Sequence, residues 1–495
     1  MQKCQLPWVL ICLFSGFIIS AWVVSLYFVI DADISNSPTV WHEITQHGWP
    51  VMKNWLPTPD NWYFSAYPVH FIIYEILGTS SPEIILWIST FQIFICSLLA
   101  ALICYERSKN IFSFILVPIF CGLGHYAQNV GYLAHPFSHN LTNLYGLLCI
   151  YLYLINLRRC NLAVDILIYV LIIIASVSDP WLLAAFYLPF LLTTVYEVCV
   201  LKTRNHRALI IPMLTGVILF SHTIERLFGL PTISFHHGTF LQSVENAYWL
   251  LFGLGGLLNM FVVEKSSTFI VSALVILTAY FTSIRNLKKI SNIDFLTVMS
   301  VLGITSAFII SDVPGAYYSG RFLVNILYLT VIVIFLRALS GRKILWLPIT
   351  MIIISSYITN LQVKPVRDDL SKTEGLLTFL RNNHLNYGYG PYWGTEALAI
   401  SWISNFQQII RPVTFNKSTG FMESYGRMQT FTNWYEKKET NAISQQFIAI
   451  LNDGEECRNV EVCLEGVKKQ FGMPEQILTF KSITFYVYNK PLNLK

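Results

Sequence analysis

The chain has 495 residues, of which 54% are hydrophobic, 15% aromatic and only 12% charged, and its formal net charge is +5. Soluble domains carry about twice that charged fraction, so the composition excludes an ordinary soluble protein. The positive charge does not indicate a nucleic-acid partner, because the basic residues stand in short clusters between apolar runs. The length of those runs predicts a polytopic α-helical membrane protein.

Eleven apolar runs are candidates for transmembrane helices. They cover residues 7–30, 83–104, 111–126, 139–157, 162–178, 182–200, 208–222, 268–284, 293–311, 322–337 and 344–359. The first run is too long for a signal-peptide core and lacks a small-residue cleavage site, so we expect it to be retained.

The basic clusters predict the orientation of these helices. They lie on alternate connections, at Arg107–Lys109, Arg158–Arg159, Lys202–Arg207, Arg285–Lys289 and Arg337–Lys343, on the same side as Lys3. The positive-inside rule makes that side cytoplasmic. The N-terminus is then cytoplasmic, and the long first loop, 31–82, and the C-terminal region lie on the outer side.

The first outer loop begins with two acidic residues, Asp31 and Asp33, and continues with Glu43 and a series of tryptophans. A carboxylate at the membrane boundary can accept a proton from an incoming hydroxyl or hold a metal ion. The aromatic faces suit sugar rings and also suit the interface itself. Equally, Asp31 and Asp33 can simply end a helix in water. The following segment, 65–78, is amphipathic and is expected to lie along the interface.

The next outer turns carry further ionisable groups. His135 and His139 lie in the turn 127–140, and the short turn 178–181 contains Asp179 and Trp181. An ionisable group at this depth is a functional candidate. The alternative for Asp179 is a capping role, with Pro180 at the first position of the next helix.

The region 223–267 contains the apolar, glycine-rich stretch 249–263. If that stretch crossed the membrane, the alternation of basic loops would break at Arg285. We therefore expect a re-entrant or interfacial segment packed against protein, with a true membrane span as the alternative.

Arg321 begins an apolar run on the side where basic residues are scarce, directly after Tyr317 and Tyr318. A guanidinium at the outer interface suits a phosphate group, which it can bind with two parallel hydrogen bonds. The tyrosines could stack on a sugar or anchor at the interface. The alternative is an ion pair between Arg321 and Asp312.

The composition becomes polar after residue 360, which divides the chain into a membrane region, 1–360, and an outer region, 361–495. The pattern predicts a small α/β domain with helices from a capping box at Ser371, at 394–405 and at 441–452, and strands near 408–415 and 482–489. Cys457 and Cys463 are the only cysteines there. An oxidising outer compartment favours a disulfide between them, with two free thiols as the alternative.

This layout resembles the GT-C class of integral-membrane glycosyltransferases. The features that carry the resemblance are an odd number of spans, the acidic pair in the first outer loop, the outer-facing Arg321 and the polar outer C-terminal region. Size and layout look most like the bacterial and phage serotype-converting O-antigen glucosyltransferases (Gtr type), and the stretches Tyr387–Trp393 and Thr484–Lys490 look like the ends of such proteins.

The resemblance implies transfer of a hexose, for example glucose, from an undecaprenyl-phosphate-linked sugar donor to a lipid-linked O-antigen or similar glycan acceptor. The reaction would take place with inversion at the periplasmic face of the bacterial inner membrane. Asp31 or Asp33 would act as base, and Arg321 would bind the donor phosphate. Residues that would contact substrate are Glu43, His135, His139, Asp179, Trp181, Tyr317, Tyr318, Trp393, Trp434 and Tyr435. A divalent metal, Mg²⁺ or Mn²⁺, stays open, because the second outer loop offers histidines and no acid.

Three other functions stay open from the sequence. They are an O-antigen polymerase or ligase, a membrane O-acyltransferase, and a flippase or transporter of lipid-linked sugars. Charged residues are missing from the middle of the spans, which disfavours ion-coupled transport.

Overall fold

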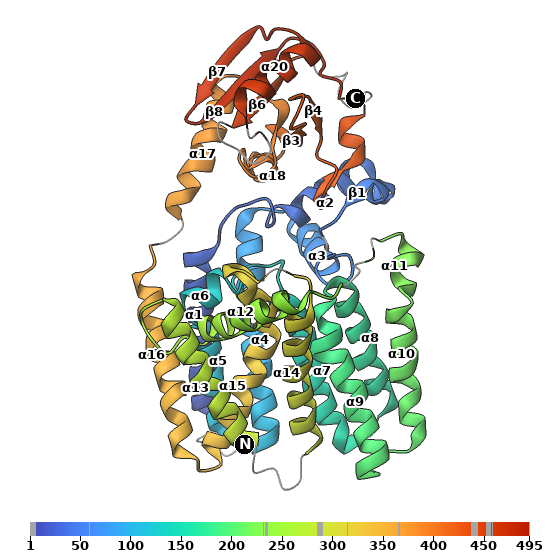
Figure 1. Ribbon diagram of the computed structural model, residues 1–495, viewed down its shortest axis with the longest axis vertical. Helices are drawn as coiled ribbons and strands as arrows, with labels where there is room; N and C mark the ends of the chain where they lie inside the picture. The colour runs from blue at the N-terminus through green and yellow to red at the C-terminus, as the bar shows by residue number, and fades with distance from the viewer. Residues whose placement is uncertain are drawn as a thin grey trace. The chain divides into compact units, whose positions relative to one another are not determined.

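A computed structural model of the chain describes residues 6–58, 60–159, 161–230, 232, 236–284, 291–313, 315–364, 367–436, 444–451, 457 and 459–494. The chain forms two compact units (Figure 1). Unit 1 comprises Met1–Phe28, Asp60–Pro68 and Leu86–Pro365, and unit 2 comprises Val29–Pro59, Val69–Ile85 and Val366–Lys495. The expected membrane region, 1–360, includes the first loop, 31–82, whereas most of this loop belongs to the same unit as the C-terminal region.

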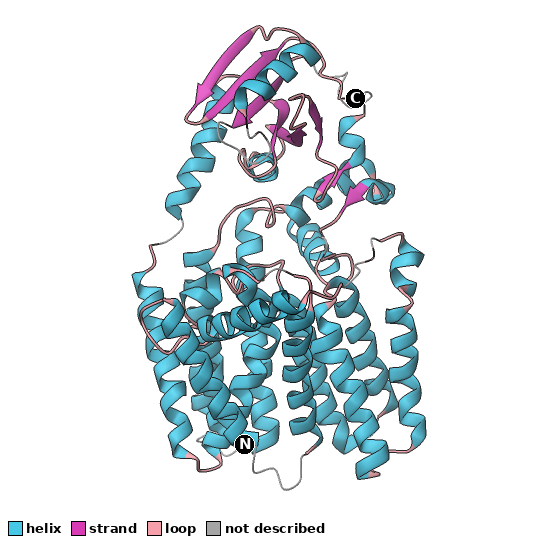
Figure 2. Cartoon of the chain, viewed as in Figure 1, coloured by secondary structure: helices cyan, strands magenta, loops and turns pink. Residues whose placement is uncertain are grey.

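Unit 1 is almost entirely helical (Figure 2). Eight of its described helices are long and apolar enough to cross a membrane. They are Leu6–Tyr27, Pro82–Ser108, His139–Arg158, Leu183–Leu201, Ser266–Ile284, Asn292–Ile310, Tyr317–Leu339 and Lys343–Gln362. Shorter apolar helices at Ile111–Cys121, Leu162–Ser178 and His206–Phe220 fall in the three remaining predicted ranges. The chain is therefore a multi-pass membrane protein by the length and composition of its helices.

The individual elements of this unit have the following bounds. They are α1 (Leu6–Tyr27), α4 (Pro82–Ser108, whose first residues belong to unit 2), η2 (Ile111–Ile115), α5 (Leu116–Cys121), α6 (His125–Asn129), α7 (His139–Arg159), α8 (Leu162–Ser178), η3 (Leu183–Tyr187), α9 (Leu188–Tyr196), η4 (Glu197–Leu201), η5 (His206–Leu209), α10 (Ile210–Phe220), α11 (Thr223–Phe228), α12 (Phe240–Leu257), α13 (Ser266–Ile284), α14 (Asn292–Ile310), η6 (Tyr317–Leu323), α15 (Val324–Leu339), η7 (Lys343–Leu345) and α16 (Trp346–Gln362).

Helix α12 runs across the ends of the upright helices in Figure 1, and it is not among the eight long apolar helices. Its glycines explain how closely it packs. A Cβ atom at Gly255 would lie 1.7 Å from the carbonyl oxygen of Phe269, and one at Gly256 would lie 2.6 Å from the ring of Tyr126. The glycine-rich stretch therefore packs against protein on this side, and a re-entrant or interfacial position of 223–267 in the membrane stays a prediction.

The antiparallel pair α7 and α8 carries ionic groups at both ends. At the end where α7 finishes and α8 begins, Arg204 binds Asp165 and Glu197, each at 3.2 Å. Tyr153 adds a hydrogen bond to Glu197 at 2.6 Å. The opposite end, where α8 finishes and α7 begins, carries Asp179 and His139.

Unit 2 is built on a six-stranded mixed sheet with strand order β4-β3-β2-β6-β8-β7. The strands are β4 (Met422–Ser424), β3 (Ile409–Phe415), β2 (Tyr387–Pro391), β6 (Gln446–Leu451), β8 (Ile483–Tyr488) and β7 (Gln476–Phe480). The central strand β2 pairs in parallel with β3 and β6, and the outer pairings are antiparallel. A Cβ atom at Gly388 would lie 2.4 Å from Phe447, which explains a glycine in this crowded central strand.

The helices of unit 2 are α2 (Asn36–His47), η1 (Trp49–Asn54), α3 (Tyr67–Leu77, whose first two residues belong to unit 1), α17 (Arg367–Asn382), α18 (Ala397–Ile403), η8 (Thr432–Tyr435) and α20 (Val460–Phe471). A two-stranded antiparallel pair, β1 (Trp55–Leu56) and β5 (Thr430–Phe431), joins the first loop to the C-terminal region. Trp55 is opposite Phe431, with ring centroids 4.7 Å apart. The first loop is thus folded together with residues almost 400 positions later.

Two sequence predictions for this region are wrong. The range 441–452 was expected to be helical, but residues 446–451 form strand β6. This strand lies between β2 and β8 and is buried along almost its whole length, so its continuous apolar run does not show strand alternation. Helix α17 begins at Arg367, so Ser371 lies inside the helix and does not cap it.

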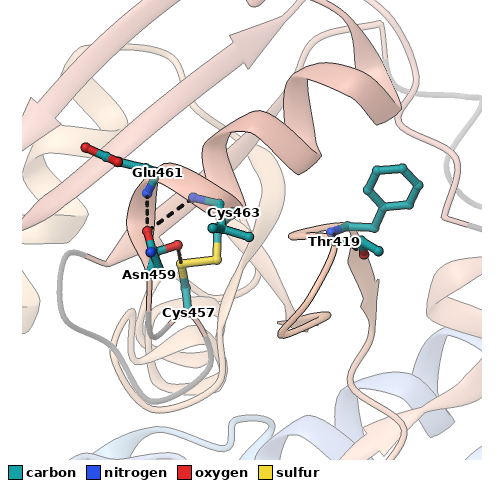
Figure 3. The surroundings of a disulfide bond; sticks show 7 residues. Thr419, Cys457, Asn459, Glu461 and Cys463 are labelled. Atoms are coloured by element: carbon teal, nitrogen blue, oxygen red, sulfur yellow. Dashed lines mark hydrogen bonds between the residues drawn. A yellow bond between two sulfur atoms is a disulfide. The ribbon is translucent and has the colours of Figure 1, made fainter.

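Cys457 and Cys463 form a disulfide bond with a Cα–Cα distance of 6.3 Å (Figure 3). Asn459 lies between them and begins helix α20. Its side-chain oxygen accepts hydrogen bonds from the backbone N–H groups of Glu461 and Val462. The bond therefore covalently fixes the start of a capped helix.

Candidate functional site

The predicted site residues divide between the two units. Unit 1 contains His135, His139, Asp179, Trp181, Tyr317, Tyr318 and Arg321, and unit 2 contains Asp31, Asp33, Glu43, Trp393, Trp434 and Tyr435.

In unit 1, His139 and Asp179 form a buried pair. The His139 Nδ1 atom lies 2.6 Å from Asp179 Oδ2, and the two side chains are 5% and 0% exposed. The same oxygen accepts a hydrogen bond from Thr142 Oγ1 at 2.7 Å. The other carboxylate oxygen accepts the N–H of Trp181 at 3.0 Å, so Asp179 also caps the start of the next helix. The capping role that the sequence left open for Asp179 is therefore confirmed, and its role as a functional group stays a prediction.

This arrangement fixes the imidazole ring of His139 through Nδ1. Within the described part of the chain, its Nε2 atom forms no hydrogen bond. A histidine held by a carboxylate in this way can accept or donate a proton at the second ring nitrogen. The His139 ring also contacts the ring of Phe322, with centroids 5.1 Å apart. The Trp181 ring contacts Phe322 at the same centroid distance.

Arg321 lies beside this pair. Its guanidinium carbon is 5.0 Å from the Phe322 ring centroid and 5.8 Å from that of Tyr132, and its charge acts on His139. Its Nε atom is buried without a hydrogen-bond partner, and no described carboxylate lies at ion-pair distance. The ion pair with Asp312 that the sequence left open is therefore not formed among the described residues. An unpaired guanidinium held between aromatic rings is a suitable partner for an anion.

The remaining predicted residues of unit 1 lie less centrally. The Nδ1 atom of His135 contacts the backbone of Phe137, which stabilises the local turn. Tyr317 and Tyr318 are 41% and 57% exposed, and the backbone carbonyl of Tyr317 accepts a hydrogen bond from Tyr126. Sequence reasoning missed Thr142, Phe322 and Asp60. Asp60 acts electrostatically on His139.

In unit 2, the two aspartates of the first loop have different surroundings. Asp31 Oδ1 accepts the backbone N–H of Ile34 at 2.8 Å, which stabilises the turn before α2. Asp33 Oδ1 accepts a hydrogen bond from the side chain of Gln429 at 2.6 Å. Gln429 has a left-handed backbone, with φ of 50°. A left-handed backbone in a non-glycine residue costs about 1–3 kcal/mol and is held in place by the surrounding structure.

Tyr392 is buried near these carboxylates. Burial raises the pKa of its phenol, and the charges of Asp33 and Asp31 raise it further. The phenol is therefore protonated under all ordinary conditions and can donate a hydrogen bond. Trp393, next to it, is 41% exposed and packs edge-on against Tyr392 with centroids 4.8 Å apart.

A second polar group in unit 2 surrounds Glu43, which is 2% exposed. Its Oε1 atom accepts hydrogen bonds from Trp434 Nε1 at 2.7 Å and from Arg411 at 3.2 Å. The guanidinium of Arg411 stacks 3.9 Å from the Trp434 ring centroid. Tyr435 is bound to the backbone carbonyl of Pro412 at 2.5 Å. Arg411 and Gln429 gave no sequence signal, because each is an isolated polar residue far along the chain from its acidic partner.

No group of three or more metal-ligating side chains was found among the residues that the structure describes. The geometry therefore offers no specific set of ligands for Mg²⁺ or Mn²⁺ in that part of the chain.

Comparison with protein-family models and with curated proteins found no match to this chain.

Proposed function

We propose that this protein is an integral-membrane glycosyltransferase of the GT-C class. It would transfer a hexose from a polyprenyl-phosphate-linked donor to a glycan acceptor, at the periplasmic face of the bacterial inner membrane. The observation that carries the proposal is the guanidinium of Arg321, which forms no ion pair with a described residue and whose buried Nε atom has no hydrogen-bond partner among them, beside the His139–Asp179 pair. A donor phosphate would supply the missing partner.

The chemistry requires stabilisation of the leaving phosphate and removal of a proton from the acceptor hydroxyl. Arg321 would neutralise the negative charge that develops on the phosphate as the glycosidic bond breaks. Asp33, positioned by Gln429, would accept the hydroxyl proton as that oxygen attacks the anomeric carbon. A single displacement of this kind inverts the configuration at that carbon.

His139 is a second candidate for the proton acceptor. Its Nδ1 atom is fixed by Asp179, and the Nε2 atom is the ring nitrogen that remains for proton transfer. Different observations support the two candidates. Asp33 is supported by the resemblance to GT-C enzymes and by its contact with Gln429, whose backbone is left-handed. His139 is supported by the nearby charge of Arg321. Substituting each one separately, as Asp33→Asn and His139→Gln, identifies the base as the residue whose loss abolishes transfer.

The experiment that tests the proposal measures transfer by the purified full-length protein in lipid nanodiscs. Undecaprenyl-phosphate-linked hexose with a radioactive label is the donor, and lipid-linked glycan is the acceptor. We expect Arg321→Ala to lower kcat/KM for the donor by a factor of about 100, the effect of removing one donor to a developing anion.

A matched control is Arg226→Ala, because Arg226 is an exposed arginine of unit 1 in helix α11. It should transfer at the wild-type rate. Wild-type activity in Arg321→Ala, or equal losses in both variants, would contradict the assigned role of Arg321.

A further inference from the structure

A polar cavity lies within unit 2, beside the Glu43 group described above. Its volume is about 160 Å³, and Glu43, His47, Tyr387, Ile409, Arg411, Asn433 and Trp434 line it. One water molecule needs roughly 15 Å³ of such space, so the cavity has room for a small ring and not only for single waters. All of its lining residues belong to one unit.

The polar atoms of these lining residues are incompletely satisfied. Three buried atoms have no hydrogen-bond partner in the described part of the chain, namely Glu43 Oε2, Arg411 Nε and Asn433 Oδ1. His47 Nε2 lies 3.6 Å from Glu43 Oε2, which is beyond normal hydrogen-bond distance. Buried polar groups normally have partners, so a set of three points to a ligand or to ordered water.

The chemistry of the three atoms limits the ligand. Glu43 Oε2 and Asn433 Oδ1 only accept hydrogen bonds, whereas Arg411 Nε only donates. An ionised carboxylate or a phosphodiester has no hydrogen to donate, so it could satisfy only the arginine. A hydroxyl group can both donate and accept, so adjacent hydroxyls on one ring satisfy all three atoms.

The charges and the aromatic rings of the cavity favour the same class of ligand, a ring that carries hydroxyl groups. The negative charge of Glu43 is balanced by Arg411 at 3.2 Å, so the site has no excess charge to compensate. Trp434 and Tyr387 provide apolar ring surface beside the polar atoms, which suits the C–H faces of a sugar.

We infer that this cavity binds one neutral, polyhydroxylated sugar ring, and that the bound ring takes no part in the transfer reaction. Binding itself does not depend on transferase activity. Its assignment as a recognition site for one residue of the acceptor glycan rests on the proposed function.

The test is saturation-transfer NMR on the full-length protein in nanodiscs, which avoids detergents with sugar headgroups. The probes are the methyl glycosides of glucose, galactose, mannose and rhamnose at millimolar concentrations, with sodium acetate as the anionic probe. We expect saturable binding of at least one glycoside and no competition by acetate.

Two variants test the site. Asn433→Ala removes an acceptor that receives no hydrogen bond from the described residues, so its folding should be unaffected. Glu43→Gln keeps the size of the side chain but replaces one acceptor with a donor. Each should weaken glycoside binding about tenfold, equivalent to about 1.4 kcal/mol. The matched control is Glu423→Gln, an exposed glutamate of the same unit, which should bind as wild type.

Absence of saturable binding to all four glycosides, or wild-type binding in both cavity variants, would overturn the inference and leave ordered water as the occupant. Competition by acetate would overturn it in favour of an anion site. Asp33→Asn separates the two proposals, because it should lose transfer and keep glycoside binding. Transfer without glycoside binding refutes only the cavity site, and binding without any transfer refutes only the transferase.

Discussion

Replacing Asp179 by asparagine tests the buried pair in unit 1. The carboxylate accepts three hydrogen bonds, from His139, Thr142 and the backbone of Trp181. Hydrogen bonds to a charged group contribute about 1.5–3 kcal/mol each and neutral ones about 0.5–1.5 kcal/mol. Loss of the charge at three bonds should therefore lower the free energy of unfolding by roughly 3 kcal/mol.

The substitution also changes the chemistry of His139. When the asparagine oxygen accepts the hydrogen bond from the Trp181 N–H, the amide NH₂ group faces His139 and Thr142. The imidazole then accepts at Nδ1 and carries its hydrogen on Nε2. The ring can then no longer accept a proton at Nε2. A positioned acid or base contributes about 100-fold or more to the rate, so transfer should fall by at least that factor where His139 is the proton acceptor.

Unfolding can be followed through the buried cysteines of unit 1 with a thiol-reactive fluorophore. Cys12, Cys96, Cys104, Cys121 and Cys149 are buried and free, and Cys199 is exposed and gives the baseline signal. Asp179→Asn should label at a lower temperature than wild type, and Glu245→Gln, an exposed carboxylate on α12, should not. Wild-type labelling and wild-type transfer in Asp179→Asn would refute the reasoning.

Three further outcomes follow from the structure. Asp33→Asn should abolish transfer without lowering protein yield, and measurable transfer in that variant would exclude Asp33 as the base. Denatured, unreduced protein should leave Cys457 and Cys463 unmodified by a thiol reagent, and labelling only after reduction is the positive result. Burial lowers the pKa of His70 to about 3, so below its unfolded pKa of about 6.5 only the unfolded state gains a proton. Urea unfolding followed by tryptophan fluorescence should therefore show unit 2 losing up to about 1.4 kcal/mol per pH unit between pH 6.5 and 3, and His70→Gln should lose less.

The apolar runs predicted the helices of unit 1 well, because each helix must bury or shield its backbone within its own segment. The main uncertainty concerned 249–263, where the glycines that favour close packing are equally common in membrane spans. In the structure, Gly255 and Gly256 contact Phe269 and Tyr126, and this long-range fit has no local signature.

The C-terminal region was predicted less well, for a physical reason. Strand β6 is buried along almost its whole length, so its sequence lacks the alternation that identifies a half-exposed strand. Strands β3 and β8 were predicted because they combine β-branched and aromatic residues with a clearer pattern.

The site residues could be nominated from the sequence, but their partners could not. Asp33 binds Gln429, and Glu43 binds Arg411 and Trp434. The partners in these pairs are 368 to 396 residues apart along the chain. The pairing of β1 with β5 and the packing of unit 2 bring them together. By contrast, His139 and Asp179 belong to adjacent antiparallel helices, so their contact could have been predicted from the topology alone.

The central claim, that the protein transfers a sugar, is tested most directly by the structure of the surface glycan. Lipopolysaccharide would be analysed by NMR from bacterial cells that carry the wild-type gene, the Asp33→Asn variant or no copy. We expect a side-branch hexose that is present only with the wild-type gene. A glycan with unchanged branching in all three strains, or one altered only in chain length or acylation, would contradict it.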